Sequence, residues 1–246
     1  NVSEIDLTTV VPSVATTIGG LTGAFAWGPA NEITIINNEV QLATRFGKPD
    51  ANTYETFFTA ANFLSYGSDL RVVRSLGATA KNATANSIVT TVLIENGSDY
   101  EQNHSSNTAS IFNAKWPGAL GNSIKFSIAD SLSNTTAYSA WAYSGEFDSI
   151  PATSAWASDR SSANDEMHII VIDNDGRWTG TPGSILEKFA YVSKASDGKR
   201  NDGTSAYYKD VINQQSKYLY WMDHHKMLCH IVLIQLLQIM SFLCLQ

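Results

Sequence analysis

The sequence has little cysteine and little charge for its 246 residues. Its two cysteines, Cys229 and Cys244, both lie in the last 18 residues. The preceding chain therefore has no disulfide framework, as is usual for proteins that fold in a reducing cytosol. Only 16% of the residues are charged, against roughly 25% in an average globular domain. Ser, Thr, Asn, Ala and Gly fill the gap, and this composition suits a β-rich, closely packed assembly.

Basic residues are also scarce. The chain has 16 Lys and Arg against 23 Asp and Glu, which gives a net charge of −7, and it contains no run rich in Lys or Arg. A nucleic-acid-binding surface needs clustered basic side chains. The sequence therefore argues against a nucleic-acid partner.

Catalytic and metal-binding motifs are missing as well. There is no Gly-x-Ser-x-Gly elbow and no His-Glu-x-x-His, and His104 and His168 have no nucleophile or second ligand at a recognisable spacing. The segment 173–176 resembles the start of a calcium loop, but its glycine stands fourth instead of sixth and a serine replaces the glutamate at position twelve. We expect a turn there. We also expect no enzyme activity, no catalytic residue, no cofactor and no metal site.

The pattern of the first 77 residues predicts an extended arm, then a strand, helix and strand that form an α/β unit. Strands are expected at Leu21–Trp27, Ile33–Ile36 and Leu70–Leu76. Asn38 has the chemistry of an N-cap, and Gly47 follows the end of the short helix that it starts. A second helix is expected from the N-cap Thr53 to Gly67. Its apolar residues, spaced three and four apart, predict one buried stripe: Tyr54, Phe57, Phe58, Ala61 and Leu64.

The remaining chain predicts mostly strands. They are expected at Ser87–Ile94, Thr108–Asn113, Ser123–Asp130, Met167–Ile172 and Tyr218–Trp221. Ile185–Val192 fits either another strand or the start of a short helix, and Ser205–Ile212 fits a helix. The sequence Asn-Asp-Gly at 174–176 predicts a tight hairpin.

The last 21 residues, 226–246, differ from everything before them. Every acidic residue lies at or before Asp223, and this tail is apolar with a few interruptions. Three interpretations compete. A membrane anchor needs roughly 20 apolar residues, a buried helix would be apolar nearly all round, and a translated frameshift explains the abrupt change. We favour the frameshift, with the authentic sequence ending near His224.

Several strings read together resemble the N-terminal part of the tail sheath protein of contractile-tailed bacteriophages. They are Gly23-Ala-Phe-Ala-Trp-Gly-Pro-Ala30, Asn38-Glu-Val40, Phe46-Gly-Lys-Pro49, Phe58-Thr-Ala-Ala-Asn-Phe-Leu-Ser-Tyr-Gly-Ser-Asp69 and Leu70-Arg-Val-Val-Arg-Ser75. The piece Ala114–Lys125 adds a Pro-Gly-x-x-Gly-Asn turn that leads into a strand in such proteins. The resemblance covers roughly residues 5 to 224. It implies that this chain is a fragment of a longer protein.

The resemblance implies a mixed α/β (α+β) multi-domain fold, in which a small α/β sheath-core segment precedes a β-rich inserted domain. We expect an extended arm at 1–17, the N-terminal part of the core at 18–77 and a loose β-rich insertion at 78–162. A β-rich segment with a hairpin and a helix follows at 163–225, and the aberrant tail occupies 226–246. The surface domain of larger sheaths is expected to be reduced or missing.

The function implied is that of a structural subunit of the sheath. Sheath subunits form hexameric rings stacked helically around a tail tube, and contraction drives the tube through the host envelope. The expected partners are copies of the same protein, the tail tube and the baseplate, with no membrane for the authentic part. The expected location is the virion, after assembly in the host cytoplasm.

Two groups of residues are candidates for contacts between subunits. In the family an N-terminal arm adds a strand to a neighbour's sheet, and the residues of this chain that match the arm are Glu4, Ile5, Leu7, Val10 and Val11. Arg71 and Arg74 flank an apolar strand, where they fit either a charged contact between stacked subunits or a device that keeps an edge strand soluble. The family's C-terminal domain, which holds the acceptor sheet, has no counterpart here.

Other functions stay open at this stage. A β-rich surface or glycan-binding module would use Trp116, Trp141 and Trp156 as exposed stacking platforms. A sheath of a related bacterial contractile injection system shares the same residues, and a hydrolase with a hidden site is a third possibility.

Overall fold

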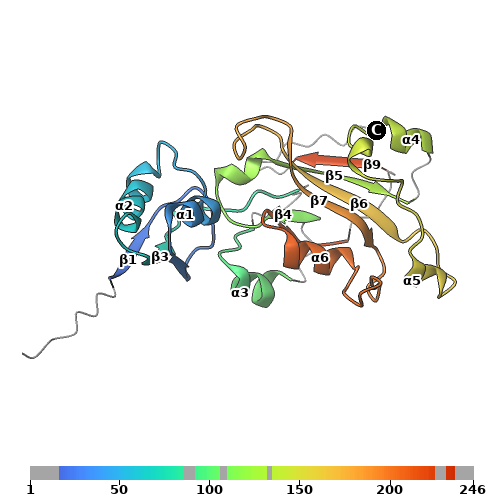
Figure 1. Ribbon diagram of the computed structural model, residues 1–246, viewed down its shortest axis with the longest axis horizontal. Coiled ribbons are helices and arrows are strands. Elements are labelled where there is room, and N and C mark those ends of the chain that lie inside the picture. Colours follow the sequence, from blue (N-terminus) through green and yellow to red (C-terminus); the bar gives the residue numbers. More distant parts are fainter. Residues whose placement is uncertain (1–16, 86–91, 106–109, 132–134, 225–230, 236–246) are drawn as a thin grey trace, which may run out of the picture.

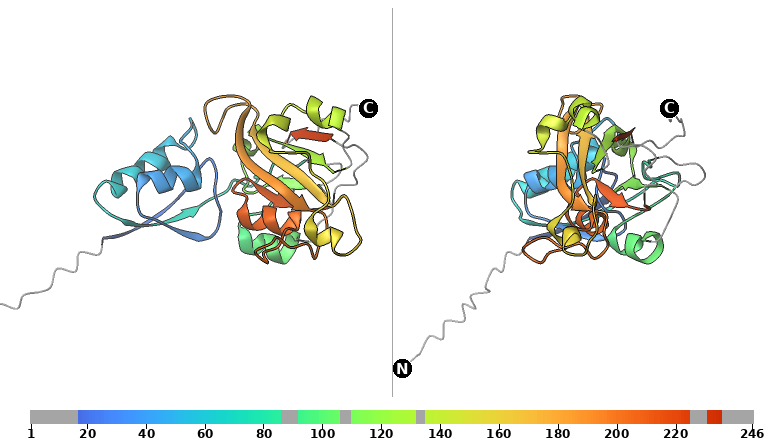
Figure 2. Two further views of the ribbon diagram at one scale, coloured as in Figure 1. Left: turned by 45° about the vertical axis from the view of Figure 1, so that its right-hand side comes forward. Right: turned by 90° about the vertical axis from the view of Figure 1, so that its right-hand side faces the viewer.

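The computed structural model describes residues 17–85, 92–105, 110–131, 135–224 and 231–235 and has a mixed α/β architecture (Figure 1). A small unit, built from residues 18–74, lies at one end of the molecule and carries two helices on a short sheet. A larger unit, built from the described residues after 81, holds the longer strands (Figures 1 and 2).

The small unit has a three-stranded sheet in the order β1-β3-β2, in which β1 (Ile18–Gly23) runs parallel and β2 (Ile33–Ile36) antiparallel to β3 (Asp69–Arg74). Two helices, α1 (Glu39–Phe46) and α2 (Tyr54–Leu64), pack on one face of it. The core between them consists of Phe25, Ile36, Leu42, Phe46, Phe57, Ala60, Leu70 and Val72. The strand–helix–strand order expected from the sequence is therefore present.

Local chemistry explains the boundaries of α1. The Asn38 side chain accepts a hydrogen bond from the Gln41 backbone N–H at 2.9 Å, which satisfies one of the free donors of the first turn. Gly47 follows the helix with φ of +79°, a conformation that favours glycine. Both predictions for α1 are confirmed.

Helix α2 differs from the expectation in two ways. Thr53 precedes the helix, but its hydroxyl exchanges hydrogen bonds with Asp50 and makes no capping bond to the helix. Phe57 is buried in the core, whereas Tyr54 is 49% and Phe58 52% exposed. The single buried stripe was therefore wrong for Tyr54 and Phe58, because the helix meets the sheet through Phe57 and Ala60.

The larger unit is built on a four-stranded antiparallel sheet in the order β7-β6-β5-β9. Its strands are β5 (Ile124–Asp130), β6 (Glu166–Asp173), β7 (Ser184–Ser193) and β9 (Ile231–Gln235). A two-stranded sheet pairs β4 (Phe112–Ala114) with β8 (Leu219–Trp221). The helices are α3 (Gly97–Asp99), α4 (Thr135–Ala140), α5 (Ala155–Ser158) and α6 (Tyr208–Gln215). Short helical turns lie at η1 (Tyr100–His104), η2 (Ala119–Ser123) and η3 (Ser144–Glu146).

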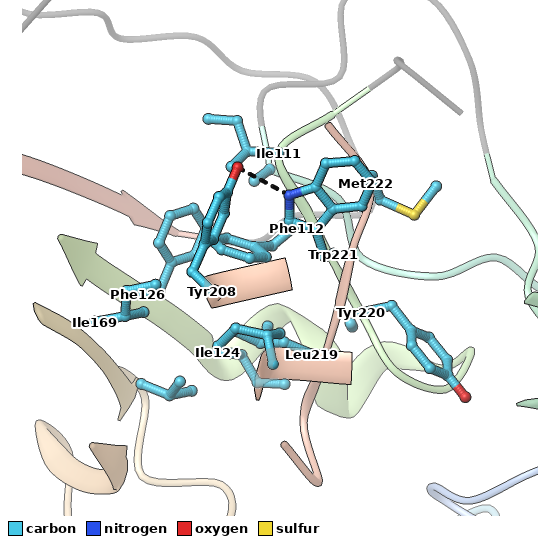
Figure 3. Close-up of a cluster of buried hydrophobic side chains, with 14 of the residues drawn as sticks. Ile111, Phe112, Ile124, Phe126, Ile169, Tyr208, Leu219, Tyr220, Trp221 and Met222 are labelled. Carbon is cyan, nitrogen blue, oxygen red and sulfur yellow. Dashed lines mark hydrogen bonds between the residues drawn. The ribbon is translucent and has the colours of Figure 1, made fainter. Parts of the chain in front are cut away.

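Both faces of strand β6 are buried. Ile169 and Val171 point into the main core, which α6 and the β4–β8 pair close, while Ile170 and Ile172 join a second cluster with Trp141. Part of the main core appears in Figure 3, where the Trp221 indole Nε1 donates to the Tyr208 hydroxyl at 3.0 Å. A strand covered on both faces reads as a continuous apolar run, which is why the sequence pattern located it well.

The β6–β7 hairpin is confirmed but its turn is not tight. Asp173 pairs with Ser184, so the connection is a loop of residues 174–183. The Asp173 carboxylate organises that loop, since it accepts bonds from the backbone N–H groups of Trp178 and Thr179 at 2.9 Å each. The segment 184–193 is a strand, which excludes the helical alternative.

Other expected elements are found with shifted ends. The Pro117–Gly118 turn leads through η2 into β5, as the resemblance implied. A strand was expected at 87–94. Residues 92–94 are described and do not form a strand, and residues 86–91 lie outside the described part. Strand β4 begins at Phe112, and part of the segment expected before it also lies outside.

The apolar tail, residues 226–246, contradicts the interpretation as a buried helix in its described part. Residues 231–235 form strand β9, which pairs antiparallel with β5 from Lys125 to Ala129, so a helix is wrong for that stretch. Residues 225–230 and 236–246 lie outside the described part. Among the described residues, no helix combines the length and the apolar character that crossing a membrane requires.

Candidate functional site

The most distinctive surface of the small unit is the face of its sheet that α1 and α2 do not cover, which we call the open sheet face. Side chains alternate across a strand, so Leu70 and Val72 enter the core while Arg71 points the other way. The residues on the open sheet face are Ile18, Gly20 and Thr22 from β1, Ile33 and Ile35 from β2, and Asp69, Arg71 and Val73 from β3.

Three isoleucines make this face apolar. Ile18 is 53%, Ile33 68% and Ile35 52% exposed. Large side chains of this kind are usually buried, and a cluster of them at the surface is typical of an interaction site. The open sheet face is therefore the first candidate for a contact with other polypeptide.

The register places one charge in the middle of the face. Arg71 lies between Gly20 of β1 and Ile35 of β2. Its Nε is 3.7 Å from an Asp69 carboxylate oxygen, and both side chains are more than a third exposed. Exposed ion pairs contribute little, about 0–1 kcal/mol, so Arg71 remains available to a partner.

The two edge strands of this sheet, β1 and β2, have few of the features that usually protect an edge. Within the described ranges no further strand pairs with β1 or β2, and neither strand contains a charged residue or a proline. Natural proteins usually protect edge strands with such residues, because free backbone groups pair readily with other chains. The edges add hydrogen-bonding capacity beside the apolar face.

The structure separates the predicted contact residues. Arg71 lies on the open sheet face, as described above. Arg74 is only 3% exposed, and its guanidinium donates to backbone carbonyls inside the chain. The edge-strand interpretation is wrong for both, because β3 is the central strand of its sheet. A subunit contact stays a prediction for Arg71, whereas the buried side chain of Arg74 offers no surface for one. Glu4, Ile5, Leu7, Val10 and Val11 lie outside the described residues.

The proposed saccharide platforms are not exposed. Trp116 and Trp141 are each 6% exposed and belong to the main core and the second cluster. The third, Trp156, is partly buried, and the Arg160 guanidinium carbon lies 3.2 Å from its ring centroid. Trp116 and Trp141 therefore cannot act as exposed stacking platforms.

The titratable groups in the interior serve structural roles. The His168 ring is fully buried, and its Nδ1 accepts from the Tyr191 backbone N–H at 3.1 Å while Nε2 lies 2.9 Å from the Ser149 carbonyl oxygen. Burial lowers the pKa of His168 below its usual value, which keeps the ring neutral. Burial alone would raise the pKa of Asp173, but the hydrogen bonds that it accepts outweigh this and lower it. The described part of the chain contains no group of three His, Cys, Asp or Glu that could hold a metal ion.

Sequence reasoning missed the open sheet face. Ile33 and Ile35 were assigned to a strand, but nothing in a four-residue strand shows which of its faces is covered. The signal that was present is the absence of any charged residue in β1 and β2.

The comparisons with known proteins all match sheath proteins. Residues 16–74 match the family model of the tail sheath protein Gp18 domain III N-terminal region. The chain is 44% identical over 97 residues to the tail sheath protein of Vibrio phage KVP40 and 47% identical over 85 residues to that of Enterobacteria phage T4. These matches cover 38% and 33% of this chain, and 14% and 13% of the relatives.

A longer match is found with the tail sheath protein of Salmonella phage ViI, which is 31% identical over 169 residues, covering 68% of this chain and 24% of the relative. The chain thus spans about a quarter or less of the length of these curated relatives. Crystal structures of sheath tail proteins from Listeria innocua and Desulfitobacterium hafniense overlap 88% and 89% of this chain and 33% and 35% of their own chains. Their sequence identities are 12% and 14%, with TM-scores of 0.40 and 0.43.

Proposed function

Because this chain is a relative of the bacteriophage tail sheath proteins, we propose that it serves as a structural subunit of a contractile phage tail sheath. In this role it contributes part of a ring of six subunits, and the rings stack helically around a tail tube. Contraction of the cylinder drives the tube through the host envelope. The proposed partners are copies of the sheath protein, the tube and the baseplate, and the proposed location is the virion, after assembly in the host cytoplasm.

This role requires no catalytic step. Energy is stored in a metastable assembly and released when packed subunits move to a second arrangement, since packed interfaces are bistable. The three relatives matched by sequence are proteins of phages, which favours a phage tail over a bacterial injection system. The glycan-binding alternative loses its support, because Trp116 and Trp141 are buried.

The observation that carries the proposal is the open sheet face. Its exposed isoleucines and the uncharged strands beside them suit a contact with further sheath polypeptide, in which apolar burial supplies the stability and the sheet edges offer backbone hydrogen bonds. Arg71, in the middle of the face, would orient that contact. The residues matched by the family model, 16–74, include this entire face.

The test compares the purified chain with the double variant Ile33→Glu/Ile35→Glu. Sedimentation velocity and negative-stain electron microscopy measure assembly over a range of concentrations. The control is Val40→Glu on helix α1, because Val40 is 77% exposed and lies away from the face. All three positions are exposed, so each single substitution should change the free energy of unfolding by only about 0.5 kcal/mol.

We expect the unmodified chain and the control to self-associate into oligomers, and the double variant to remain monomeric. Assembly that is unaffected by the two glutamates would reject the open sheet face as the contact. A chain that stays monomeric at every concentration, with or without the substitutions, would contradict self-assembly of this chain.

A further inference from the structure

The junction between the small and the larger unit has a defined architecture. The two units lie side by side, with the small unit at one end (Figure 2). A loop of the small unit, residues 24–32, extends into the larger one. Trp27 from this loop is 3% exposed and belongs to the main core of the larger unit. Its ring lies edge-on to Trp178, with centroids 4.8 Å apart at 89°.

The Arg74 side chain lies at the centre of this junction. Its Nε donates to the Phe25 carbonyl oxygen at 3.0 Å, and Nη1 donates to that of Gly28 at 2.7 Å. The remaining arm, Nη2, donates to the Pro117 carbonyl oxygen at 2.7 Å. Phe25 packs in the small core, whereas Pro117 belongs to the larger unit, directly before η2 and β5. One planar group therefore joins the end of β3, the loop and the larger unit.

The residues around the Arg74 guanidinium leave little room for another arrangement of the junction. Gly118 has φ of +135°, and a Cβ built there would lie 3.0 Å from the Ala26 carbonyl oxygen and 3.2 Å from Arg74 Nη2. Beside this contact, the Ala30 backbone N–H donates to the Glu95 carbonyl oxygen at 2.7 Å, and the Asn96 side chain donates to the Ala30 carbonyl oxygen at 3.1 Å.

The chemistry of the contact is unusual for a buried charge. Buried charged groups are normally paired with an opposite charge, yet Arg74 forms no ion pair with a carboxylate within the described ranges, and its acceptors are carbonyl oxygens. Burial lowers the pKa of Arg74 to about 10, so the guanidinium is protonated at neutral pH. Three carbonyls in different directions match the rigid fork of arginine, which a lysine cannot reproduce.

We infer that the three hydrogen bonds of the Arg74 guanidinium fix the orientation of the small unit relative to the larger one, so that the two units behave as one rigid body. We call this contact the latch. The strand β3 carries this side chain at its last residue, where the chain leaves the small unit for the connecting segment 75–82. Release of the latch would free that segment and the loop, including Phe25 and Trp27, while the remaining residues of both cores stay packed.

The experiment uses the full chain and the variants Arg74→Met and Arg74→Lys. Hydrogen exchange measured by mass spectrometry follows segments 24–32 and 75–82 at the junction, with α2 and β6 reporting on the two cores. The matched control is Arg200→Met, which replaces an exposed arginine outside segments 24–32 and 75–82. Limited proteolysis provides an independent readout of the connecting segment.

In Arg74→Met we expect exchange and cleavage at the junction to rise about tenfold or more, because three charge-assisted hydrogen bonds are lost. Exchange in α2 and β6 should stay within about twofold, as expected for opening limited to one local unit. Arg74→Lys should lie between the methionine variant and the unmodified chain, and the Arg200→Met control should match the unmodified chain.

Two results would overturn the inference. Unchanged protection at the junction would mean that Arg74 does not hold the units together. Equal loss of protection in the junction and in both cores would mean that Arg74 stabilises one common core. If Arg74→Met fails to fold, the same comparison in Arg74→Lys decides between local opening, which supports the latch, and global loss, which contradicts it.

Discussion

The buried histidine of the larger unit predicts how stability depends on pH. His168 is fully buried in strand β6. Its ring is stacked on Phe147 with centroids 4.2 Å apart, and Tyr191 and Tyr138 lie against it at 4.6 and 6.3 Å. No carboxylate is among these ring neighbours, so a positive charge on the ring would be uncompensated.

Protonation would also break a hydrogen bond. The His168 Nδ1 accepts from the Tyr191 backbone N–H, and a protonated Nδ1 is a donor only. Burial therefore holds the folded-state pKa of His168 below its usual value, with the hydrogen bond to Ser149 acting in the opposite direction. In the unfolded chain the pKa is about 6.5.

The direction of the pH dependence follows from the two pKa values of His168, in the folded and in the unfolded chain. Below about pH 6.5 the unfolded chain takes up a proton that the folded chain does not, so stability is lost as the pH falls toward the lowered folded-state pKa. One proton gives a slope of at most about 1.4 kcal/mol per pH unit. We expect the free energy of unfolding to fall from pH 6.5 to pH 5.

Urea denaturation at half-unit steps from pH 8 to pH 5 measures this slope. The variant His168→Gln removes the titration, and Asn37→Ala, an exposed substitution without a titratable group, serves as the control. The reasoning predicts a smaller slope in His168→Gln and an unchanged slope in the control. Identical pH dependence in His168→Gln and the unmodified chain would refute it.

Two further predictions concern single side chains and are measured by urea denaturation at pH 7. Asn38→Ala should lower the free energy of unfolding by about 1 kcal/mol, because the cap of α1 is lost. The control Asn37→Ala, at the exposed neighbouring residue, should change this free energy much less. Equal effects of the two substitutions would contradict the capping role. Phe126→Ala should cost about 3–5 kcal/mol, because this fully buried ring packs edge-on against Phe112 at 4.8 Å. A loss below 1 kcal/mol would mean that the main core is loosely packed.

Some features of this fold could be predicted because one short segment contains their cause. Asn38 and Gly47 define the ends of α1 through bonds and backbone angles that involve only neighbouring residues. The apolar run of β6 was located because a strand buried on both faces needs no alternation. The family resemblance likewise depends on short strings, and the comparisons confirm it.

Other features depend on residues far away in the sequence. Helix α2 has apolar residues around more than half of its circumference, so its sequence does not show which ones the sheet will cover. The structure covers Phe57 and leaves Tyr54 and Phe58 in solvent. The sequence predicted a tight hairpin after β6, but the connection is a longer loop in which the Asp173 carboxylate accepts hydrogen bonds from the backbone of Trp178 and Thr179.

Composition and local pattern by themselves determined that this is an acidic α/β chain without a recognisable catalytic motif and that it resembles a tail sheath protein. The tertiary structure alone decided the fate of the two arginines of β3. Both looked like surface charges in the sequence, yet Arg71 lies on the open sheet face and Arg74 is buried. The reason is that the carbonyl groups that compensate Arg74 come from Phe25, Gly28 and Pro117, which are 43 to 49 residues away and meet only when the chain is folded.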